Sequence, residues 1–228
     1  MLTRFAPSPT GLLHLGHAFS ALTAWDAARR AGGRFLLRIE DLDTARCRPE
    51  FETAIDEDLR WLGLSWTEPV MRQSERSAAY AHALGRLAAL GVLYPCRCTR
   101  RDIQAALSAP QEGAGKPAPV YPGTCRGRPM AERGPGDALR IDLGRALSLV
   151  GTRLPAFTET GPIHAGTHRP DPGRLVAELG DVVLARRDIG TSYHLAVVVD
   201  DAAQGITDVV RGEDLFSVTP LHVLLQAL

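Results

Sequence analysis

Two histidines near the amino terminus stand where a phosphate-binding site would be built. His14 and His17 flank Leu15-Gly16 and follow a rigid segment, Pro7-Ser8-Pro9-Thr10-Gly11. A helix that starts here offers unpaired N–H groups and its positive dipole end to an anionic phosphate, and Gly16 lets a nucleotide approach the backbone closely. The pattern favours a nucleotide-phosphate site. The alternatives are a pair of satisfied loop histidines or half of a metal site.

A second group of charged residues closes the next apolar run. Arg38-Ile39-Glu40-Asp41-Leu42-Asp43 ends with three acids. A free amino acid needs a polar anchor for its amine and one for each carboxylate, because buried charges must be paired. Each Arg–Glu pair has a simpler reading as a salt bridge, and Asp200-Asp201 has one as a turn or a helix cap.

Three of the four cysteines can share one site. Cys96 and Cys98 place both thiols on one side of an extended segment, and Cys125 follows a Gly/Pro-rich stretch that could fold back. Three thiolates suit zinc, but structural zinc is nearly always four-coordinate, and the cysteines supply only three ligands here. The alternative is a set of reduced thiols without metal. Cys47 has no place in this pattern.

Apolar periodicity and turn residues predict a chain in which strands and helices alternate. Strands are expected at 3–6, 34–39, 138–143, 181–186 and 193–199, and helices at 17–31, 50–62, 74–90 and 220–228. The first helix carries Phe19, Leu22, Trp25 and Ala28 on one face. The almost continuously apolar run at 193–199 predicts a central strand. This order predicts an α/β fold with a parallel sheet and right-handed crossovers.

Residues 92–137 break this rhythm with their cysteines and a Pro/Gly-rich stretch. We therefore expect an inserted subdomain at 92–137, between a first half of the main α/β domain at 1–91 and a second half at 138–228. Five arginines of the insertion either meet RNA phosphates or form a solvated basic surface: Arg97, Arg100, Arg101, Arg126 and Arg128.

The composition fits a globular protein with a hydrophobic core. The 228 residues are 45% hydrophobic and 23% charged, and the formal net charge is zero, which gives no overall electrostatic indication of nucleic-acid binding. No apolar run approaches the ~20 residues of a membrane span. The first residues lack the apolar stretch of a secretory signal. We therefore expect a cytoplasmic protein without a membrane partner.

The first histidine motif carries a family resemblance. Pro7-Ser8-Pro9-Thr10-Gly11 followed by His14-Leu15-Gly16-His17 resembles the HIGH element of class I aminoacyl-tRNA synthetases in its glutamyl-type form. The resemblance extends over nearly the whole chain and implies a Rossmann-like catalytic domain. It implies that His14, Gly16 and His17 hold the phosphates of ATP, accompanied by Mg²⁺, and stabilise the transition state of adenylate formation.

The same resemblance implies a pocket for L-glutamate. The implied residues are Arg4, Phe5, Ala6, Pro7, Ser8, Glu40, Tyr193 and Arg211. Glu40 would contact the substrate amine, Tyr193 would lie on a strand at the pocket floor, and Arg211 would end the next strand. Two arginines and one glutamate complement the charges of glutamate and favour it over glutamine. Which arginine takes which carboxylate stays open.

Tyr121-Pro122-Gly123-Thr124-Cys125 resembles the glutamyl-queuosine tRNA(Asp) synthetases, whose zinc ligands are Cys-x-Cys and then Tyr-x3-Cys. The resemblance implies one structural Zn²⁺ on Cys96, Cys98, Tyr121 and Cys125. These synthetases lack an anticodon-binding part, activate glutamate without tRNA, and transfer it to the queuosine base of tRNA(Asp). The implied function is that of a ligase with L-glutamate, ATP and queuosine-containing tRNA(Asp) as its partners, acting as a monomer.

One departure concerns the second ATP motif of class I synthetases, a KMSKS-like loop with a lysine. Lys116, the only lysine, lies in the insertion, and we expect the chain to end at Leu228 before that loop begins. Such a loop helps to position ATP, so substrate identity is better indicated than turnover. Two alternatives stay open: the catalytic fragment of a conventional glutamyl-tRNA synthetase, and a truncated, non-catalytic protein that binds glutamate or tRNA.

Overall fold

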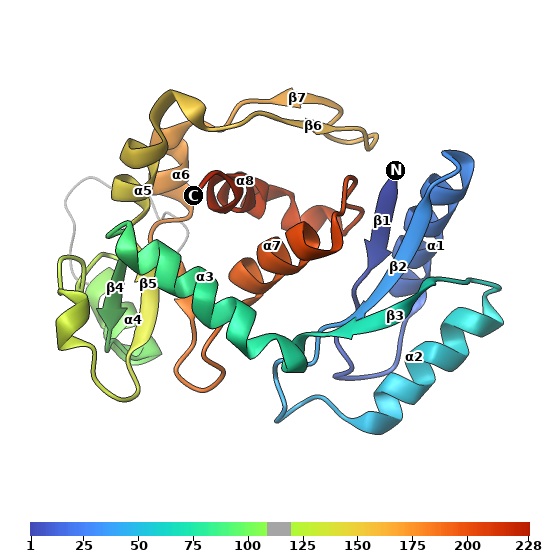
Figure 1. Ribbon diagram of the computed structural model, residues 1–228. Helices are drawn as coiled ribbons and strands as arrows, with labels where there is room; N and C mark the ends of the chain where they lie inside the picture. Colours follow the sequence, from blue (N-terminus) through green and yellow to red (C-terminus); the bar gives the residue numbers. More distant parts are fainter. Residues whose placement is uncertain (109–119) are drawn as a thin grey trace. The chain divides into compact units, whose positions relative to one another are not determined.

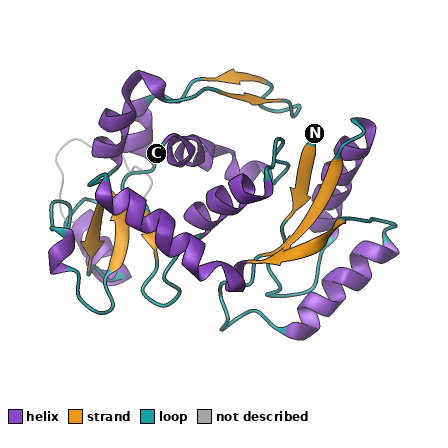
Figure 2. Ribbon diagram, in the orientation of Figure 1, coloured by secondary structure: helices purple, strands orange, loops and turns teal. Residues whose placement is uncertain are grey.

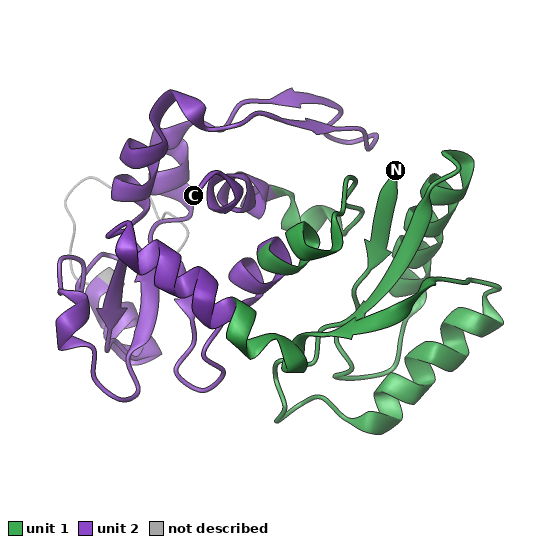
Figure 3. Ribbon diagram, in the orientation of Figure 1, with its two compact units in different colours: residues 1–79, 199–216 green, residues 80–198, 217–228 purple. Residues whose placement is uncertain are grey.

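The computed structural model describes residues 1–108 and 120–228 (Figure 1). Lys116 lies outside the described residues. The chain divides into two compact units, Met1–Ala79 with Val199–Phe216 (unit 1) and Tyr80–Val198 with Ser217–Leu228 (unit 2), coloured separately in Figure 3. The domain borders expected near residues 91 and 137 stay predictions, because a compact unit is defined by packing alone.

Unit 1 is built on a three-stranded parallel sheet in the order β1-β2-β3. Its strands are β1 (Leu2–Phe5), β2 (Arg34–Ile39) and β3 (Thr67–Arg72). The parallel sheet and its first two strands are as the sequence predicts. The third was missed because Thr67–Arg72 is exposed or only half-buried and contains Pro69, so it shows no apolar alternation.

Two helices of unit 1 connect these strands, as Figure 2 shows. Helix α1 spans Leu15–Arg30 and α2 spans Pro49–Trp61. The start of α2 follows ordinary helix rules, since proline is tolerated in the first turn and acidic residues there favour the dipole. Both helices lie within two residues of their predicted bounds.

The predicted apolar face of α1 is right for Trp25 and Ala28, which pack in or against the core, and wrong for Phe19 and Leu22. Its buried residues are Ala21, Ala24 and Ala28, whereas Phe19 is 72% exposed and Leu22 is 38% exposed. The reason is the close approach of helix and sheet, where the Thr3 hydroxyl donates to the carbonyl oxygen of Ala24 at 2.9 Å. Small side chains suit such a close approach, and Phe19 and Leu22 lie on the exposed side of the helix.

The core of unit 1 joins the sheet to these alanines and to α2. Its members are Phe5, Ala21, Ala24, Ala28, Phe35, Leu37, Ile39, Ile55, Leu59 and Leu64. The strand and helix residues of this core therefore hold the carboxyl ends of β1 and β2, where Arg4 and Glu40 lie, in fixed positions.

Unit 2 contains a separate antiparallel sheet in the order β4-β5-β8. Its strands are β4 (Leu93–Cys96), β5 (Ala138–Ile141) and β8 (Val183–Ala185), and a hairpin is formed by β6 (Phe157–Glu159) and β7 (Gly166–His168). Strands were expected at 138–143 and 181–186 and are present there. Strand β4, from the expected insertion, pairs directly with β5.

The other α-helices are α3 (Ser77–Ala89), α4 (Arg100–Ser108), α5 (Leu143–Val150), α6 (Pro172–Glu178), α7 (Tyr193–Gln204) and α8 (Thr219–Ala227). Short 3-10 helices span Gln73–Arg76, Met130–Glu132, Gly151–Arg153 and Glu213–Val218. The predicted helices at 74–90 and 220–228 are confirmed. Among the described residues, no helix is long and apolar enough to cross a membrane.

The strand predicted at 193–199 is wrong, because these residues form the first part of helix α7. A short apolar run cannot by itself distinguish a buried strand from a buried helix. The polar continuation Asp200-Asp201-Ala202-Ala203-Gln204 extends the segment to helical length and supplies helix-forming residues. Asp200-Asp201 is accordingly neither a turn nor a helix cap, but lies inside α7.

The expected strand end around Val210–Asp214 is also absent from the described structure, where Glu213 begins a 3-10 helix. Residues just before it run beside the start of β1, and Thr207 N donates to Leu2 O at 3.0 Å. However, Leu2 N donates to the Thr207 hydroxyl rather than to a backbone carbonyl. This side-chain bond replaces a ladder bond, so no strand forms.

Leu59 provides a test of the unit 1 core, because its side chain is fully buried while Trp61 on the same helix is 85% exposed. We expect Leu59→Ala to lower the free energy of unfolding by roughly 2–5 kcal/mol through loss of apolar contacts. Trp61→Ala should change it by about 0.5 kcal/mol or less. Urea unfolding followed by circular dichroism measures both, and equal effects would contradict this packing.

Candidate functional site

The two histidines of the first motif cap helix α1. His14 is the N-cap residue, and its Nδ1 accepts a hydrogen bond from Gly16 N at 3.1 Å. In return, Nδ1 of His17 accepts from His14 N at 3.3 Å, which completes a capping box. The two rings stack with their centroids 3.8 Å apart. The histidines therefore form one rigid unit at the helix start.

This arrangement assigns the tautomers of both rings. Because each Nδ1 accepts a hydrogen bond, the proton of each neutral imidazole resides on Nε2. Burial, followed by the neighbouring His14, lowers the pKa of His17, which favours the neutral ring that the capping hydrogen bond uses. Two Nε2–H donors are thus available beside a helix N-terminus, which suits an anionic phosphate.

Gly16 packs closely against the same cap. A Cβ at this position would lie 3.0 Å from Cε1 and 3.1 Å from Nδ1 of His14. The sequence suggests that Gly16 leaves room for a nucleotide. The structure adds a local reason, because the space above Gly16 is taken by the capping imidazole.

The second part of the site is a charged network in unit 1. Arg4, only 5% exposed, donates from Nε to Asp201 Oδ1 at 2.9 Å and from Nη2 to Asp201 Oδ2 at 3.1 Å. Its Nη1 donates to Val210 O at 3.2 Å. Three of the five N–H donors of this guanidinium are used in these bonds. Among the described contacts, one donor on each terminal nitrogen is left for a ligand.

Arg38 connects this pair to Glu40. Its side chain is fully buried, and it donates to Asp201 Oδ1 at 2.6 Å, to Gln204 Oε1 at 2.9 Å and to Glu40 Oε1 at 3.2 Å. Glu40 is held a second way, since its backbone N donates to Pro7 O at 2.9 Å. The network therefore contains two guanidiniums and two carboxylates in close contact.

The two carboxylates have opposite pKa shifts. Burial opposes the ionisation of Asp201, but Arg4 and Arg38 outweigh it, and the pKa of Asp201 lies below its ordinary value. For Glu40 burial is the larger effect and raises the pKa, even though Arg38 and Arg4 act in the other direction. The ionised form of Asp201 is thus stabilised by the two arginines. An additional cation would stabilise the ionised form of Glu40 more than that of Asp201.

The structure brings together some of the residues that the sequence singled out. Arg4 and Glu40 share the network, and Arg211 directly follows Val210, the carbonyl partner of Arg4. Phe5 belongs to the core of unit 1. Among Ala6, Pro7 and Ser8, Pro7 is the one that contacts Glu40, through its carbonyl oxygen.

Tyr193 belongs to unit 2, at the start of α7. Its ring lies edge-on to His194 and His222, with centroids 5.6 Å and 5.9 Å away. His194 Nδ1 and His222 Nε2 are 3.1 Å apart. The substrate contact implied for Tyr193 stays a prediction.

Arg38 and Asp201 were missed as members of the site. In the motif that begins with Arg38, the sequence predicts a substrate-binding role for Glu40 and none for Arg38. Asp201 is predicted to lie in a turn or a helix cap. The available signal was the pair of acids that ends an apolar run at Asp200-Asp201, since an acid on an otherwise buried element has to be paired. Its partners are far away in sequence and could not be named.

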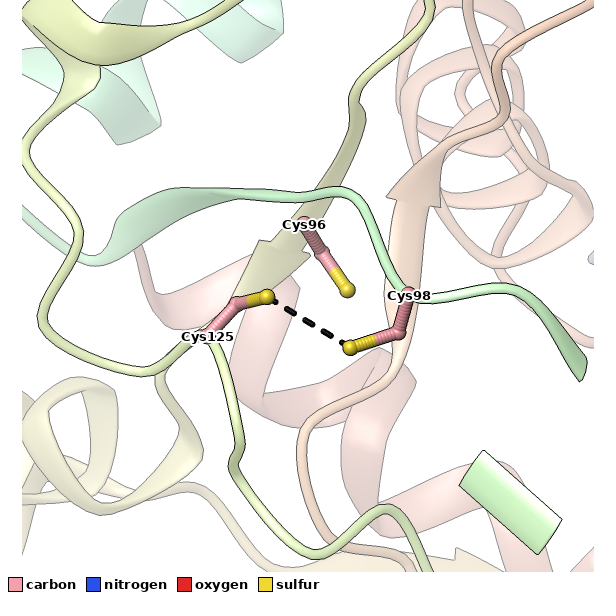
Figure 4. A group of neighbouring side chains, drawn as sticks. All are labelled: Cys96, Cys98 and Cys125. Atoms are coloured by element: carbon pink, nitrogen blue, oxygen red, sulfur yellow. Dashed lines mark hydrogen bonds between the residues drawn. The ribbon is translucent and has the colours of Figure 1, made fainter. Parts of the chain in front are cut away.

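The third feature is a cluster of cysteines in unit 2, drawn in Figure 4. The Sγ atoms of Cys96, Cys98 and Cys125 all lie within 4.8 Å of one another, and those of Cys98 and Cys125 are 3.5 Å apart. The hydroxyl oxygen of Tyr121 lies 3.5 Å from Cys96 Sγ and 3.6 Å from Cys98 Sγ. Four potential ligand atoms therefore meet at one point.

These distances fit a tetrahedral metal. Zinc bonded to sulfur and oxygen at its usual lengths places two sulfurs about 3.8 Å apart and a sulfur and an oxygen about 3.5 Å apart. Burial disfavours the thiolate of Cys125, but hydrogen bonds, first from the backbone N–H of Arg97 and then from Cys98 and Tyr121, lower its pKa to about 7. Burial raises the pKa of Cys98 and of Tyr121, so Cys125 is the ligand that ionises most readily among these three. The three close cysteines could hold a metal ion.

Arg140 lies directly against this cluster. Its Nε donates to Cys96 Sγ at 3.4 Å, and its guanidinium carbon is 3.8 Å from the ring centroid of Tyr121. Two arginines of the expected basic surface have acidic partners in unit 2, Arg126 with Asp181 at 2.7 Å and Arg128 with Asp137 at 3.2 Å. Cys47 lies in unit 1, outside the cluster.

Comparison with known families identifies the class. A family model described as tRNA synthetases class I (E and Q), catalytic domain, matches residues 1–132 and 173–228, which is more than half of the chain. The chain therefore belongs to the class I tRNA synthetases of this type, and it is a ligase, as the sequence predicts.

Curated relatives narrow the assignment. Glutamyl-Q tRNA(Asp) synthetase of Rhodobacter capsulatus is 57% identical over 100% of this chain and 82% of its own length. Glutamyl-Q tRNA(Asp) synthetase of Symbiobacterium thermophilum is 47% identical over 97% of this chain and 68% of its own length. Within the class, the chain belongs to the glutamyl-Q tRNA(Asp) synthetase family.

A solved structure agrees with the fold. The crystal structure of a glutamate tRNA ligase from Elizabethkingia meningosepticum in complex with its amino acid superposes with a TM-score of 0.75 at 29% sequence identity. The match covers 98% of this chain and 46% of that protein, so the chain spans less than half the length of this solved relative. An α/β fold with a parallel sheet, predicted from the sequence, is confirmed.

The opposite pKa shifts of Glu40 and Asp201 give a stability prediction. A raised pKa in the folded state means that Glu40 contributes stability at low pH that is lost as the pH rises through its folded pKa. Asp201, with a lowered pKa, contributes stability above its unfolded pKa that is lost as the pH falls. We therefore expect Glu40→Gln to be at least as stable as the parent protein at pH 7.

Urea unfolding at pH 4 to 7 measures this difference, which should shrink as the pH falls towards the ordinary range of a glutamic acid. Asp201→Asn is the contrasting variant and should be less stable than the parent at pH 7. A strongly destabilised Glu40→Gln protein at pH 7 would contradict the raised pKa of Glu40.

Proposed function

We propose that this chain activates L-glutamate with ATP to glutamyl-adenylate and transfers the glutamyl group to the queuosine base of tRNA(Asp). The observation that carries the proposal is the network of Arg4, Arg38, Glu40 and Asp201 in unit 1, which holds an arginine and a glutamate ready for a zwitterionic acid. The names of the curated relatives supply the acceptor, tRNA(Asp).

Glutamate fits the chemistry of this network. Arg4 keeps two N–H donors for a carboxylate, and a planar guanidinium binds a carboxylate in a bidentate manner. Glu40, whose pKa is raised mainly by burial, would regain a stable ionised state beside an ammonium group. Arg211 supplies the second cation of the proposed pocket. The solved relative in complex with its amino acid supports an amino-acid pocket in this fold.

ATP is assigned to the cap of α1. The Nε2–H donors of His14 and His17 would bind phosphate oxygens and stabilise the negative charge that develops when the carboxylate of glutamate attacks the α-phosphorus and pyrophosphate leaves with the bridging oxygen. The backbone N–H groups of the helix start would add to this field. Mg²⁺ is expected to accompany ATP as it does in most phosphoryl chemistry.

The cysteine cluster is assigned to a single structural zinc ion. Cys96, Cys98, Cys125 and Tyr121 would hold it, and the ion would fix the chain around β4 by cross-linking four side chains. The Tyr121 hydroxyl lies 3.5 Å from Cys96 Sγ and 3.6 Å from Cys98 Sγ, and the Cys98 and Cys125 sulfurs are 3.5 Å apart, which supports this assignment. No chemical step is attributed to the ion.

The function is tested with ATP, radiolabelled glutamate and tRNA(Asp) that carries queuosine. We expect glutamate-dependent pyrophosphate–ATP exchange without tRNA, followed by label on the queuosine base. His17→Ala should lower the exchange rate by at least 100-fold while calorimetry shows little change in glutamate affinity, because the imidazole acts on phosphate.

Two outcomes favour the alternatives. Label at the 3′ end of tRNA(Glu) would identify the catalytic part of a conventional glutamyl-tRNA synthetase. Glutamate binding without any exchange would identify a non-catalytic binding protein. Absence of both label and glutamate binding would reject the proposal.

Removal of the metal gives an independent prediction. We expect the purified protein to contain one zinc ion per chain and Cys125→Ser to lose it, with a lower midpoint of thermal unfolding, because metal binding is coupled to folding. Elemental analysis and calorimetry measure the two effects. Cys47→Ser is the matched control and should keep its zinc, and full retention of zinc by Cys125→Ser would contradict the assignment.

A further inference from the structure

Asp201 is the one side chain of unit 1 that contacts both arginines of the described network. Its two oxygens accept from Nε and Nη2 of Arg4 at 2.9 and 3.1 Å, and Oδ1 also accepts from Nη1 of Arg38 at 2.6 Å. Its side chain is 13% exposed and those of the arginines are 6% and 0% exposed. Charge-assisted bonds in such a site are short and directional.

These contacts determine the direction in which the remaining N–H donors of Arg4 point. The bidentate pair with Asp201 occupies the Nε edge of the guanidinium, and Val210 O occupies part of Nη1. With that edge fixed, the guanidinium plane cannot rotate, and the two remaining N–H donors keep one direction. An arginine that is held in this way loses less entropy on binding a carboxylate.

The same carboxylate acts on Glu40 through Arg38. Arg38 is fully buried and is held by Asp201 and Gln204, and its Nη2 donates to Glu40 Oε1 at 3.2 Å. One acid on α7 therefore fixes both the cation at the end of β1 and the anion at the end of β2.

We propose that Asp201 is the positioning residue of the glutamate pocket: it orients Arg4 towards a substrate carboxylate and, through Arg38, orients Glu40 towards the substrate amine. This inference rests on the proposed function, because it takes Arg4 and Glu40 as substrate-binding groups. Asp201 itself does not contact the substrate. Asparagine at this position would offer one acceptor oxygen in place of two and would turn N–H donors towards a guanidinium.

Asp200 provides a matched control for this idea. It neighbours Asp201 on α7, is fully buried, and accepts from Gln73 Nε2 at 2.9 Å and from Arg76 Nε at 3.1 Å. Asp200→Asn removes the same charge from the same helix and also disturbs a buried ion pair. A loss of fold alone should therefore affect both variants alike, whereas a positioning role is confined to Asp201.

The experiment measures glutamate-dependent pyrophosphate–ATP exchange for the parent, Asp201→Asn and Asp200→Asn, with each rate corrected for the folded fraction. We expect Asp201→Asn to raise the KM for glutamate at least tenfold while the KM for ATP stays within twofold. Asp200→Asn should leave both KM values within twofold. Equal KM values for glutamate in the two variants would overturn the inference.

A double-mutant cycle with Arg4→Lys tests the route of the effect. Because Arg4→Lys removes the route through the guanidinium edge and leaves the route through Arg38 to Glu40, we expect Asp201→Asn to raise the glutamate KM by a smaller factor in the Arg4→Lys background than in the parent, whereas independent roles would give the same factor in both. Should Asp201→Asn fail to fold, Asp201→Glu keeps the charge but shifts it by one methylene, and a parental glutamate KM in that variant would overturn the inference.

These measurements distinguish a failure of the proposed function from a failure of the positioning role of Asp201. A parent protein that shows neither glutamate-dependent exchange nor calorimetric glutamate binding would reject the proposed function and, with it, the positioning role. A parent that activates glutamate, together with an unaffected Asp201→Asn, would leave the proposed function standing and reject the role of Asp201.

Discussion

The compensation of buried charge at Arg38 is the constraint on which unit 1 depends. A guanidinium without solvent contact is tolerated only if carboxylates or other acceptors surround it, because an unpaired buried charge costs several kcal/mol. Asp201, Gln204 and Glu40 supply these acceptors. This requirement ties the end of β2 to α7, and through Asp201 it ties the end of β1 to the same helix. The elements that meet here carry the candidate substrate-binding groups.

In unit 2 an arginine also lies beside buried acidic groups, which here are mainly cysteine thiols in place of carboxylates. The cysteine cluster gathers three thiols and a phenol, which are acidic groups in a buried place, and Arg140 lies against Cys96 and Tyr121. Asp181, only 1% exposed, accepts hydrogen bonds from Tyr94 and from Arg126. Both units therefore place an arginine beside buried acidic groups, although Nε of Arg38 is buried without a hydrogen-bond partner among the described residues. The planar, multiple donors of arginine suit such sites better than an ammonium group does.

Local rules predicted much of unit 1. Strands β1 and β2, helices α1 and α2 and their parallel order follow from apolar runs, glycine breaks and a proline at a helix start. The local rules gave wrong predictions where tertiary contacts override the local sequence pattern. The alanine face of α1 was hidden because a helix that approaches a strand closely needs small residues, and these give a weak apolar signal. Helix α7 begins with a run that predicts a strand, because a short run at 193–199 that is apolar except for His194 satisfies either structure. Strand β3 gives no strand signal because it is exposed or half-buried and contains a proline.

By itself the sequence determined the chemical content of the sites: the capping histidines with Gly16, the acids after β2, and the Cys-x-Cys and Tyr-x3-Cys pair. These are short-range patterns, and the spacing along the chain defines their local geometry. Only the tertiary structure decided that Arg4, Arg38, Glu40 and Asp201 form one network, since the pairing of Arg4 with Asp201 joins residues separated by 197 positions. Long-range pairing depends on how whole elements pack, and no local pattern contains that information.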